Sequence, residues 1–179
     1  MKPHRKVIVH IATSADGYIA RPDGDIDWLT ARPAPKGFYG MEAFMKSIDT
    51  TVMGRKTYET SLQMGAKFGG KDRTIVFSRQ AAPANTPKAV EFVSEAIRPF
   101  VDRLREKPGK DIWLMGGGDI IASFLDERAI DEFVISVVPV FIGDGIPLIA
   151  RRHRLTPLNL LSTERFEDGL VQLHYAVNG

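Results

Sequence analysis

Short, strongly apolar segments of high β-propensity recur along the chain and alternate with segments in which apolar residues follow helical spacing. The strand-like segments lie at residues 7–12, 51–53, 74–77, 90–93, 112–115, 133–138 and 170–177. Several of them are apolar without interruption, which is typical of strands that are covered on both faces. Strands that alternate with helices predict an α/β fold built on a mostly parallel sheet.

Two helices are predicted from apolar stripes. The first stripe consists of Phe38, Met41, Phe44, Met45 and Ile48, and the second of Ile120, Ile121, Phe124 and Leu125. A third helical segment covers residues 94–107, where Ser94 is a good N-cap. Pro99 would lie too deep in a helix that began there, so we expect a kink or a later start.

The C-terminal segment LLSTERFEDGLVQLHYAV changes character, because apolar and polar residues alternate on both sides of Glu167, Asp168 and Gly169. This pattern predicts an antiparallel hairpin. The chain has no internal repeat and no linker long enough to divide it, so residues 1–179 are predicted to form one domain. Loops rich in Pro and Gly at residues 32–37, 65–72 and 81–88 are predicted to be surface connections.

Charge and composition exclude several classes of function. The net charge of +2 gives no general attraction to nucleic acid. The absence of cysteine excludes disulfides and thiolate metal sites, and it is consistent with a cytoplasmic protein. The apolar run near the N-terminus is too short for a signal peptide or a membrane span. We therefore expect a small-molecule substrate, with no nucleic-acid partner, no membrane and no metal.

The stretch WLMGGGDIIASFL places three glycines, residues 116–118, between a strand and a helix. A helix start offers free N–H groups and a partial positive charge, and glycine removes the side chains that would block a phosphate. The alternative is a tight turn that requires positive φ angles. Both interpretations are open from this stretch alone.

Two further junctions carry groups that bind anions. TVMGRKTYE follows a strand with Gly54, Arg55, Lys56 and Thr57, and IVFSRQ ends another strand with Ser78 and Arg79. Since ligands bind at the carboxyl ends of parallel strands, three such sites in one sheet predict an extended ligand with several phosphates, such as a dinucleotide. The first strand lacks a G-x-G-x-x-G motif, so the layout differs from the usual dinucleotide-binding fold.

The motifs VMGRKTYE, FSR and MGGGDIIASFL, which follow an opening IATSADGYIARPDGDIDWL, resemble the dihydrofolate reductase superfamily. Within it, SADGYIA and DERAIDEFVISVVPVFIGDGIPLI are similar to the reductase domain of the bacterial riboflavin-pathway deaminase-reductases and to their stand-alone relatives. The resemblance covers nearly the whole chain. It implies a dihydrofolate-reductase-like sheet flanked by helices, with NADPH bound across it.

The resemblance also implies which residues contact the cofactor. These are Ala12 and Ile19 beside the nicotinamide; Gly54, Arg55, Lys56 and Thr57 along the phosphates; Ser78 and Arg79 at the adenosine 2′-phosphate; and Gly117, Gly118, Asp119 and Ile120 with N–H groups at the pyrophosphate.

Folate reductases carry an acid on the helix before VMGRKTYE, and the corresponding position here is Gly40, with Glu42 nearby. His10 lies two residues before Ala12 and therefore on the same strand face. Its unperturbed pKa near 6.5 makes it the leading candidate for the proton donor, with Glu42 as the competitor. A buried histidine with a purely structural role is the alternative.

The substrate-binding candidates are Asp27 and Trp28, in the loop after the first strand, and Ser136, which faces the pocket according to the resemblance. A riboflavin-type substrate carries a phosphate and needs cations in the pocket. Arg21, Arg32 and Lys36 are candidates for this role, although each is equally well explained as surface charge. The apolar segment FVISVVPVFI is either the edge of a homodimer or part of the core.

The sequence predicts an NADPH-dependent reductase similar to 5-amino-6-(5-phosphoribosylamino)uracil reductase. Hydride would pass to a C=N or C=O carbon of a small heterocyclic or ribosylamino substrate. We expect no zinc-dependent deamination of the kind carried out by the other half of the riboflavin enzymes, because the sequence has no cysteine for such a zinc site. The alternatives are a dihydrofolate reductase with an unusual acid and an NADP-binding protein without turnover.

Overall fold

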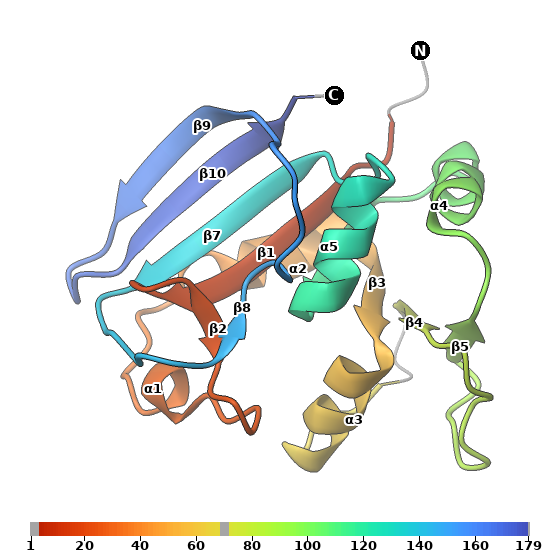
Figure 1. Ribbon diagram of the computed structural model, residues 1–179, viewed down its shortest axis with the longest axis horizontal. Coiled ribbons are helices and arrows are strands. Elements are labelled where there is room, and N and C mark those ends of the chain that lie inside the picture. Colours follow the sequence, from red (N-terminus) through yellow and green to blue (C-terminus); the bar gives the residue numbers. More distant parts are fainter. Residues whose placement is uncertain (1–3, 69–71, 179) are drawn as a thin grey trace.

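The computed structural model describes residues 4–68 and 72–178 (Figure 1). Within these residues, eight strands form one sheet in the order β5-β4-β3-β6-β1-β7-β10-β9. Its strands are β1 (Val7–Ser14), β3 (Ile48–Gly54), β4 (Arg73–Phe77), β5 (Val90–Val93), β6 (Asp111–Gly116), β7 (Glu132–Val138), β9 (Leu158–Arg165) and β10 (Val171–Val177). Both ends of the predicted domain 1–179, and the middle of the predicted loop at 65–72, lie outside the described residues.

The pairing of the strands follows the alternation of strands and helices. From β5 to β7 in the sheet order, all neighbouring strands are parallel. Each connection between them returns the chain to the edge of the sheet at which the strands begin. In the described sheet β10 alone runs against its neighbours β7 and β9. The turn between β9 and β10 contains Gly169, with a φ of 86°. The predicted α/β fold with a C-terminal antiparallel hairpin is thus confirmed.

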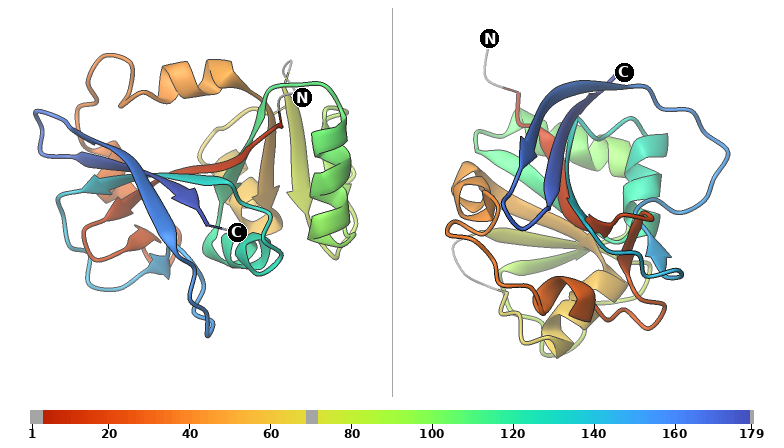
Figure 2. Two further views of the ribbon diagram at one scale, coloured as in Figure 1. Left: turned by 90° about the horizontal axis from the view of Figure 1, so that it is seen from above. Right: turned by 90° about the vertical axis from the view of Figure 1, so that its left-hand side faces the viewer.

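The helices are α1 (Asp27–Thr30), α2 (Met41–Ser47), α3 (Arg55–Gln63), α4 (Ile97–Glu106) and α5 (Gly118–Asp126). Helices α4 and α5 pack on one face of the sheet, where Val7 and Val9 of β1 meet Phe100 and Phe124. Helix α2 lies over the opposite face (Figure 2). Among the described helices, none has both the length and the apolar character that a bilayer crossing requires.

The helix predicted from the apolar stripe at residues 38–48 is too long at both ends. Phe38 lies in a turn before α2 with a φ of 49°, and Ile48 is the first residue of β3. Ile48 pairs with Asp111 of the neighbouring strand and is almost completely buried. Tertiary pairing therefore overrides the helical spacing at this position. This part of the prediction is wrong.

Helix α4 starts later than its first candidate cap. Ala96 rather than Ser94 precedes the helix, so Pro99 is its third residue. Proline is tolerated there because the backbone N–H groups of the first turn have no partner within a helix. The expectation of a later start is confirmed.

The segment FVISVVPVFI supplies β7, which lies between β1 and β10. An inner strand has no free edge, so the interpretation of this strand as a dimer edge is wrong. Phe133 and Val138 of β7 belong to the core, whereas Phe141, beyond the strand, is exposed. The edge on this side of the described sheet is β9, where Leu158, Leu160 and Leu161 are exposed.

A small second sheet was not predicted. Its strands, β2 (Tyr18–Ala20) and β8 (Ile146–Pro147), pair in antiparallel fashion although they are far apart in the sequence. A side chain on Gly145 would collide with the carbonyl oxygen of Ala20, so glycine permits this close approach. The pair holds the loop after β1 against the start of α5, where Ala150 N donates to Gly118 O at 3.1 Å.

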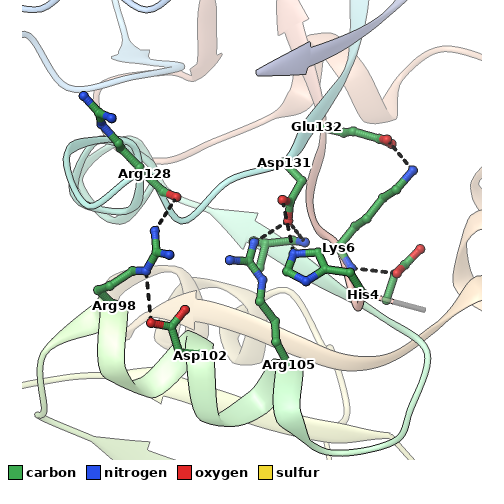
Figure 3. A network of polar contacts seen from close by, with 10 residues as sticks. His4, Lys6, Arg98, Asp102, Arg105, Arg128, Asp131 and Glu132 are labelled. Atoms are coloured by element: carbon green, nitrogen blue, oxygen red, sulfur yellow. Dashed lines mark hydrogen bonds and ion pairs between the residues drawn. The ribbon is translucent and has the colours of Figure 1, made fainter. Parts of the chain in front are cut away.

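Polar contacts fix the amino ends of β1 and β7 (Figure 3). Asp131 accepts hydrogen bonds from the backbone N–H of Val7 at 2.7 Å and from Arg105 of α4 at 2.5 Å. Lys6 donates to Glu132 at 2.6 Å. These contacts set the register of β1 against β7.

Arg5 makes a second, more deeply buried junction. Its side chain is 6% exposed, and it pairs with Asp49. It also donates to Thr50 Oγ1 at 2.9 Å and to the carbonyl oxygens of Lys110 and Leu104 at 2.6 and 3.2 Å. This one guanidinium therefore connects the segments before β1 and β6 with the start of β3 and with the C-terminal end of α4.

We predict that Arg5→Met lowers the free energy of unfolding by about 2–4 kcal/mol, because it leaves a carboxylate and several buried acceptors without their cation. The matched control is Arg98→Met. Arg98 pairs with Asp102 one helical turn away, and both side chains are 47% exposed, so a loss of at most about 0.5 kcal/mol is expected. Urea unfolding measures both, and equal losses would contradict the assignment.

Candidate active site

A cavity of about 970 Å³ opens at the carboxyl ends of the central parallel strands. Its wall includes His10 to Ala12 of β1, Gly54 at the end of β3, and Gly117 just after β6. Ligand pockets usually occupy about 300–1,000 Å³. The cavity therefore has room for a ligand as large as a dinucleotide.

Two helix N-termini meet at this cavity. Helix α3 follows β3 directly, and α5 follows β6 after Gly117. A Cβ atom on Gly54 would lie 3.7 Å from the side chain of Ile120, and one on Gly117 would lie 3.3 Å from Thr57 Oγ1. The free N–H groups and partial positive charges of the two helices therefore act on the same space, which makes it an anion-binding region.

The three glycines at the junction of β6 and α5 have different surroundings. Gly116 has a φ of 124°, which side chains rarely tolerate. A Cβ on Gly118 would lie 2.5 Å from the carbonyl oxygen of Pro147, so this glycine permits contact with the segment after β8. Gly117 has a φ of −78° and lines the cavity. The sequence left two interpretations open, a tight turn and a phosphate-binding helix start. The positive φ of Gly116 fits the tight turn, and the position of Gly117 on the cavity wall fits a phosphate-binding glycine.

Arg55 connects the second predicted anion site to the third. Its Nη1 donates to Ser78 Oγ at 3.3 Å and to Ala81 O at 2.9 Å, while its Nε donates to Glu59 at 2.8 Å. The predicted cofactor residues that line the cavity are Ala12, Ile19, Gly54, Arg55, Lys56, Thr57, Gly117, Gly118, Asp119 and Ile120. Ser78 lies behind Arg55. Arg79 is exposed and outside the cavity wall.

His10 lies on the cavity wall and is only 6% exposed. Its ring meets that of Phe44 edge-on, with 4.5 Å between the centroids, and within the described structure its Nδ1 is buried without a hydrogen-bond partner. Burial lowers the pKa of His10 to about 4, and His174 on β10 contributes to the decrease. His10 is therefore almost entirely neutral at pH 7, whereas a histidine with the unperturbed pKa near 6.5 would keep a sizeable protonated fraction.

Ser136 lies beside Ala12 in the pairing of β1 with β7, and beside Gln172 in the pairing of β7 with β10. The Nε2 of Gln172 donates to Ser136 Oγ at 3.0 Å and to the carbonyl oxygen of Tyr39 at 3.1 Å. Because Ser136 Oγ accepts this bond, its own proton remains available to a ligand. Ser136 also lines the cavity, as the resemblance implied.

Besides Ser78 and Arg79, three further predicted site residues lie outside the cavity wall. Glu42 is exposed in the first turn of α2. Asp27 is also exposed and accepts hydrogen bonds from Arg21 at 2.7 and 3.2 Å, which lower its pKa. Trp28 is buried against Tyr39 behind the wall, so it supports the cavity instead of lining it.

Sequence reasoning missed several residues of the wall, among them Tyr39, Met41, Trp113, Ile146 and Pro147. Trp113 had a usable signal, because it alternates along β6 with the fully buried Ile112 and Leu114 and must point to the opposite face. Ile146 and Pro147 had none, because their position depends on pairing with the distant β2.

The chain belongs to the family described as the RibD C-terminal domain, whose model matches residues 5–172. The uncharacterized protein YwjB of Bacillus subtilis is 39% identical over 171 residues, which cover 96% of this chain and 97% of that protein. A crystal structure from Shewanella sp. PV-4, assigned to riboflavin biosynthesis, is 32% identical with a TM-score of 0.86, and the match covers 97% of this chain and 99% of the other.

The fold is also that of dihydrofolate reductase. The Enterococcus faecalis enzyme, solved in complex with NADP(H), is similar with a TM-score of 0.69 at 15% identity, and the match covers 97% of each chain. The predicted superfamily and its subdivision are thereby confirmed. The protein is thus a member of the RibD C-terminal domain family with a dihydrofolate-reductase-like fold.

We predict different outcomes for alanine at the two neighbouring glycines. Gly118→Ala forces a methyl group against Pro147 O and should cost about 1–3 kcal/mol of stability. Gly117→Ala should retain its stability but weaken NADPH binding by about tenfold or more, because the methyl group enters the anion-binding region. Thermal unfolding and NADPH titration measure the two effects. If Gly117→Ala binds NADPH like the wild type, the assignment of Gly117 to the anion-binding region is wrong.

A second prediction concerns pH. The folded-state pKa of His10, about 4, lies below the unfolded value near 6.5, so the unfolded chain takes up this proton first as the pH falls. The free energy of unfolding should therefore decrease by about 2–3 kcal/mol as the pH falls from 6.5 to 4. His10→Gln should lack this part of the decrease. Urea unfolding of both proteins across this range tests it, and parallel pH profiles would contradict it.

Proposed function

We propose that this chain is an NADPH-dependent reductase that transfers hydride to a C=N or C=O carbon of a small heterocyclic or ribosylamino substrate. The observation that carries the proposal is the cavity shared by two helix N-termini, with Arg55 and Lys56 at one end and His10 and Ser136 at the other. Membership in the riboflavin-type family and the NADP(H) complex of the related fold support it.

The residues of the cavity fit a dinucleotide. Arg55 and Lys56 supply positive charge, and the missing Cβ of Gly117 leaves room between Thr57 and Ile19. In this proposal the phosphates of NADPH lie along Gly54–Thr57 and Gly117–Ile120. The nicotinamide would be held beside Ala12 and Ile19. The 2′-phosphate would be held near Ser78 and Arg79, together with the guanidinium of Arg55, whose Nη1 donates to Ser78 Oγ at 3.3 Å.

When bound, NADPH supplies the hydride. The substrate gains it at carbon and a proton at the adjacent nitrogen or oxygen, so that a C=N or C=O bond becomes a C–N or C–O single bond. The residues of this chain orient the acceptor and exclude water. Since His10 is neutral at pH 7, we propose that it hydrogen-bonds the reacting heteroatom while the proton comes from solvent.

The folate alternative is less well supported. Glycine stands at position 40, where the resemblance places the acid of a folate reductase, and Glu42 lies outside the cavity wall. A carboxylate that binds a pterin ring must reach it directly. Measuring NADPH oxidation distinguishes the proposed reductase from the other alternative, an NADP-binding protein without turnover. The reductase oxidises NADPH in the presence of its substrate, and the binding protein does not.

Cofactor selectivity provides the first test. We predict that Arg55→Ala weakens NADPH binding about ten- to a hundredfold, because a charge-assisted hydrogen bond contributes about 1.5–3 kcal/mol. NADH, which lacks the 2′-phosphate, should bind nearly as before. Arg79→Ala should show the same selectivity if its side chain reaches this phosphate. The control is Arg73→Ala, at the opposite end of β4 and paired with Glu91. Equal losses for the two cofactors would overturn the assignment.

The role of His10 is tested by turnover. His10→Phe should keep NADPH affinity and lower kcat/KM by about tenfold or more, because one hydrogen bond to the acceptor is lost. Glu42→Gln should change kcat/KM less than twofold, because Glu42 is exposed and outside the wall. The reverse pattern would identify Glu42 as a displaced folate-type acid.

A further inference from the structure

Charge is distributed unevenly over the cavity wall. Within residues 4–68 and 72–178, the charged side chains that line it are Arg55, Lys56 and Asp119, all at the two helix starts. The part of the wall formed around β1, β7 and α2 is called here the neutral wall. It consists of His10, Leu29, Tyr39, Met41, Trp113 and Ser136.

None of these six side chains carries a charge at pH 7. His10 is the one whose ordinary pKa lies close to neutrality, and burial lowers it to about 4. The pKa of Tyr39 is raised above its ordinary value of 10 by burial and by Asp168. The substrate end of the cavity is therefore uncharged throughout the physiological pH range.

The cations that the sequence offered for a substrate phosphate are not on this wall. Arg21 is bound to Asp27 through two hydrogen bonds. Arg32 donates to Asp168 at 2.9 Å, and the same carboxylate accepts from Tyr39 Oη at 2.5 Å. Each of these charges is offset by a carboxylate. Lys36 is exposed and, like Arg21 and Arg32, does not line the cavity.

The polar groups of the neutral wall suit uncharged partners. The Nδ1 atom of His10 is buried and finds no hydrogen-bond partner in the described part of the chain. Ser136 Oγ accepts from Gln172 and can donate its proton outward. Neutral donors and acceptors of this kind match ring nitrogens and carbonyl oxygens, and the rings of Tyr39 and Trp113 supply flat apolar surface.

We propose that the substrate is an uncharged, planar heterocycle without a phosphate group; this refinement rests on the proposed reductase function. A phosphate monoester carries about −1.5 to −2 charges at pH 7. At the neutral wall it would lose hydration without gaining a cationic partner. The cations of the cavity belong to the cofactor phosphates. The phosphorylated ribosylaminouracil of riboflavin biosynthesis is accordingly a poor substrate.

The test uses two compounds that differ by one phosphate, 5-amino-6-(5-phosphoribosylamino)uracil and its dephosphorylated form. The full chain is first saturated with NADP⁺, whose binding is measured in the same calorimetric experiment. Each compound is then titrated into the loaded protein. The phosphate-free compound is expected to bind at least about a hundredfold more tightly.

A pair of variants makes the comparison sharper. Met41→Arg places a cation on the neutral wall, whereas Met45→Arg places the same charge on the exposed side of α2, outside the wall. Met41→Arg should improve binding of the phosphorylated compound by at least about tenfold. Met45→Arg should leave the ratio of the two affinities unchanged.

The possible results are distinct. If the wild type binds the phosphorylated compound as tightly as the other, or more tightly, the inference is overturned, whatever the variants do. If neither compound binds although NADP⁺ does, the proposed substrate class is wrong while the cofactor assignment stands. If NADP⁺ itself does not bind, the proposed function fails, and the inference that rests on it fails as well.

Discussion

The parallel pairing of β3 with β6 is the constraint on which the site depends. Thr51 pairs with Trp113 and Val52 with Leu114, so the two strands run in the same direction and end at the same edge. Each strand is followed directly by a helix. The N-termini of α3 and α5 therefore meet at one cavity, and their unpaired N–H groups act together on whatever anion binds there. An antiparallel pairing would separate them by the length of the strands.

The other end of the cavity is built by rows of residues across β1, β7 and β10. Ala12, Ser136 and Gln172 form one row, and His10, Val134 and His174 form the neighbouring row on the same face of the sheet. The contacts of Asp131 and Glu132 at the amino ends of β1 and β7 hold these rows in register (Figure 3). One cavity thus has an end with two cations at the helix starts and a neutral end made by strand residues together with residues of α1 and the start of α2. In the proposed function this division would separate recognition of the cofactor phosphates from recognition of the substrate.

Local sequence patterns were sufficient to predict those elements whose conformation depends on neighbouring residues. The strands and α5 follow from apolar periodicity, the hairpin follows from its turn residues, and the junctions at Gly54 and Gly117 follow from glycine and basic residues at helix starts. The same patterns did not predict the structure where contacts with distant segments of the chain determine it. Ile48 fits a helical stripe but is buried as a strand residue, and the pairing of β2 with β8 leaves no local trace.

The sequence by itself determined the fold class and the family. It also predicted the residues at the cationic end of the cavity, because each strand–helix junction there consists of consecutive residues with a recognisable pattern. Only the tertiary structure decided the burial and the contacts of these residues and their neighbours. Gly118 is required because Pro147 approaches it, and Glu42 lies outside the cavity because α2 turns it to solvent. His10 is neutral because the surrounding strands and α2 bury it. Burial and close approach arise from contacts between segments far apart in the chain, which no local pattern specifies.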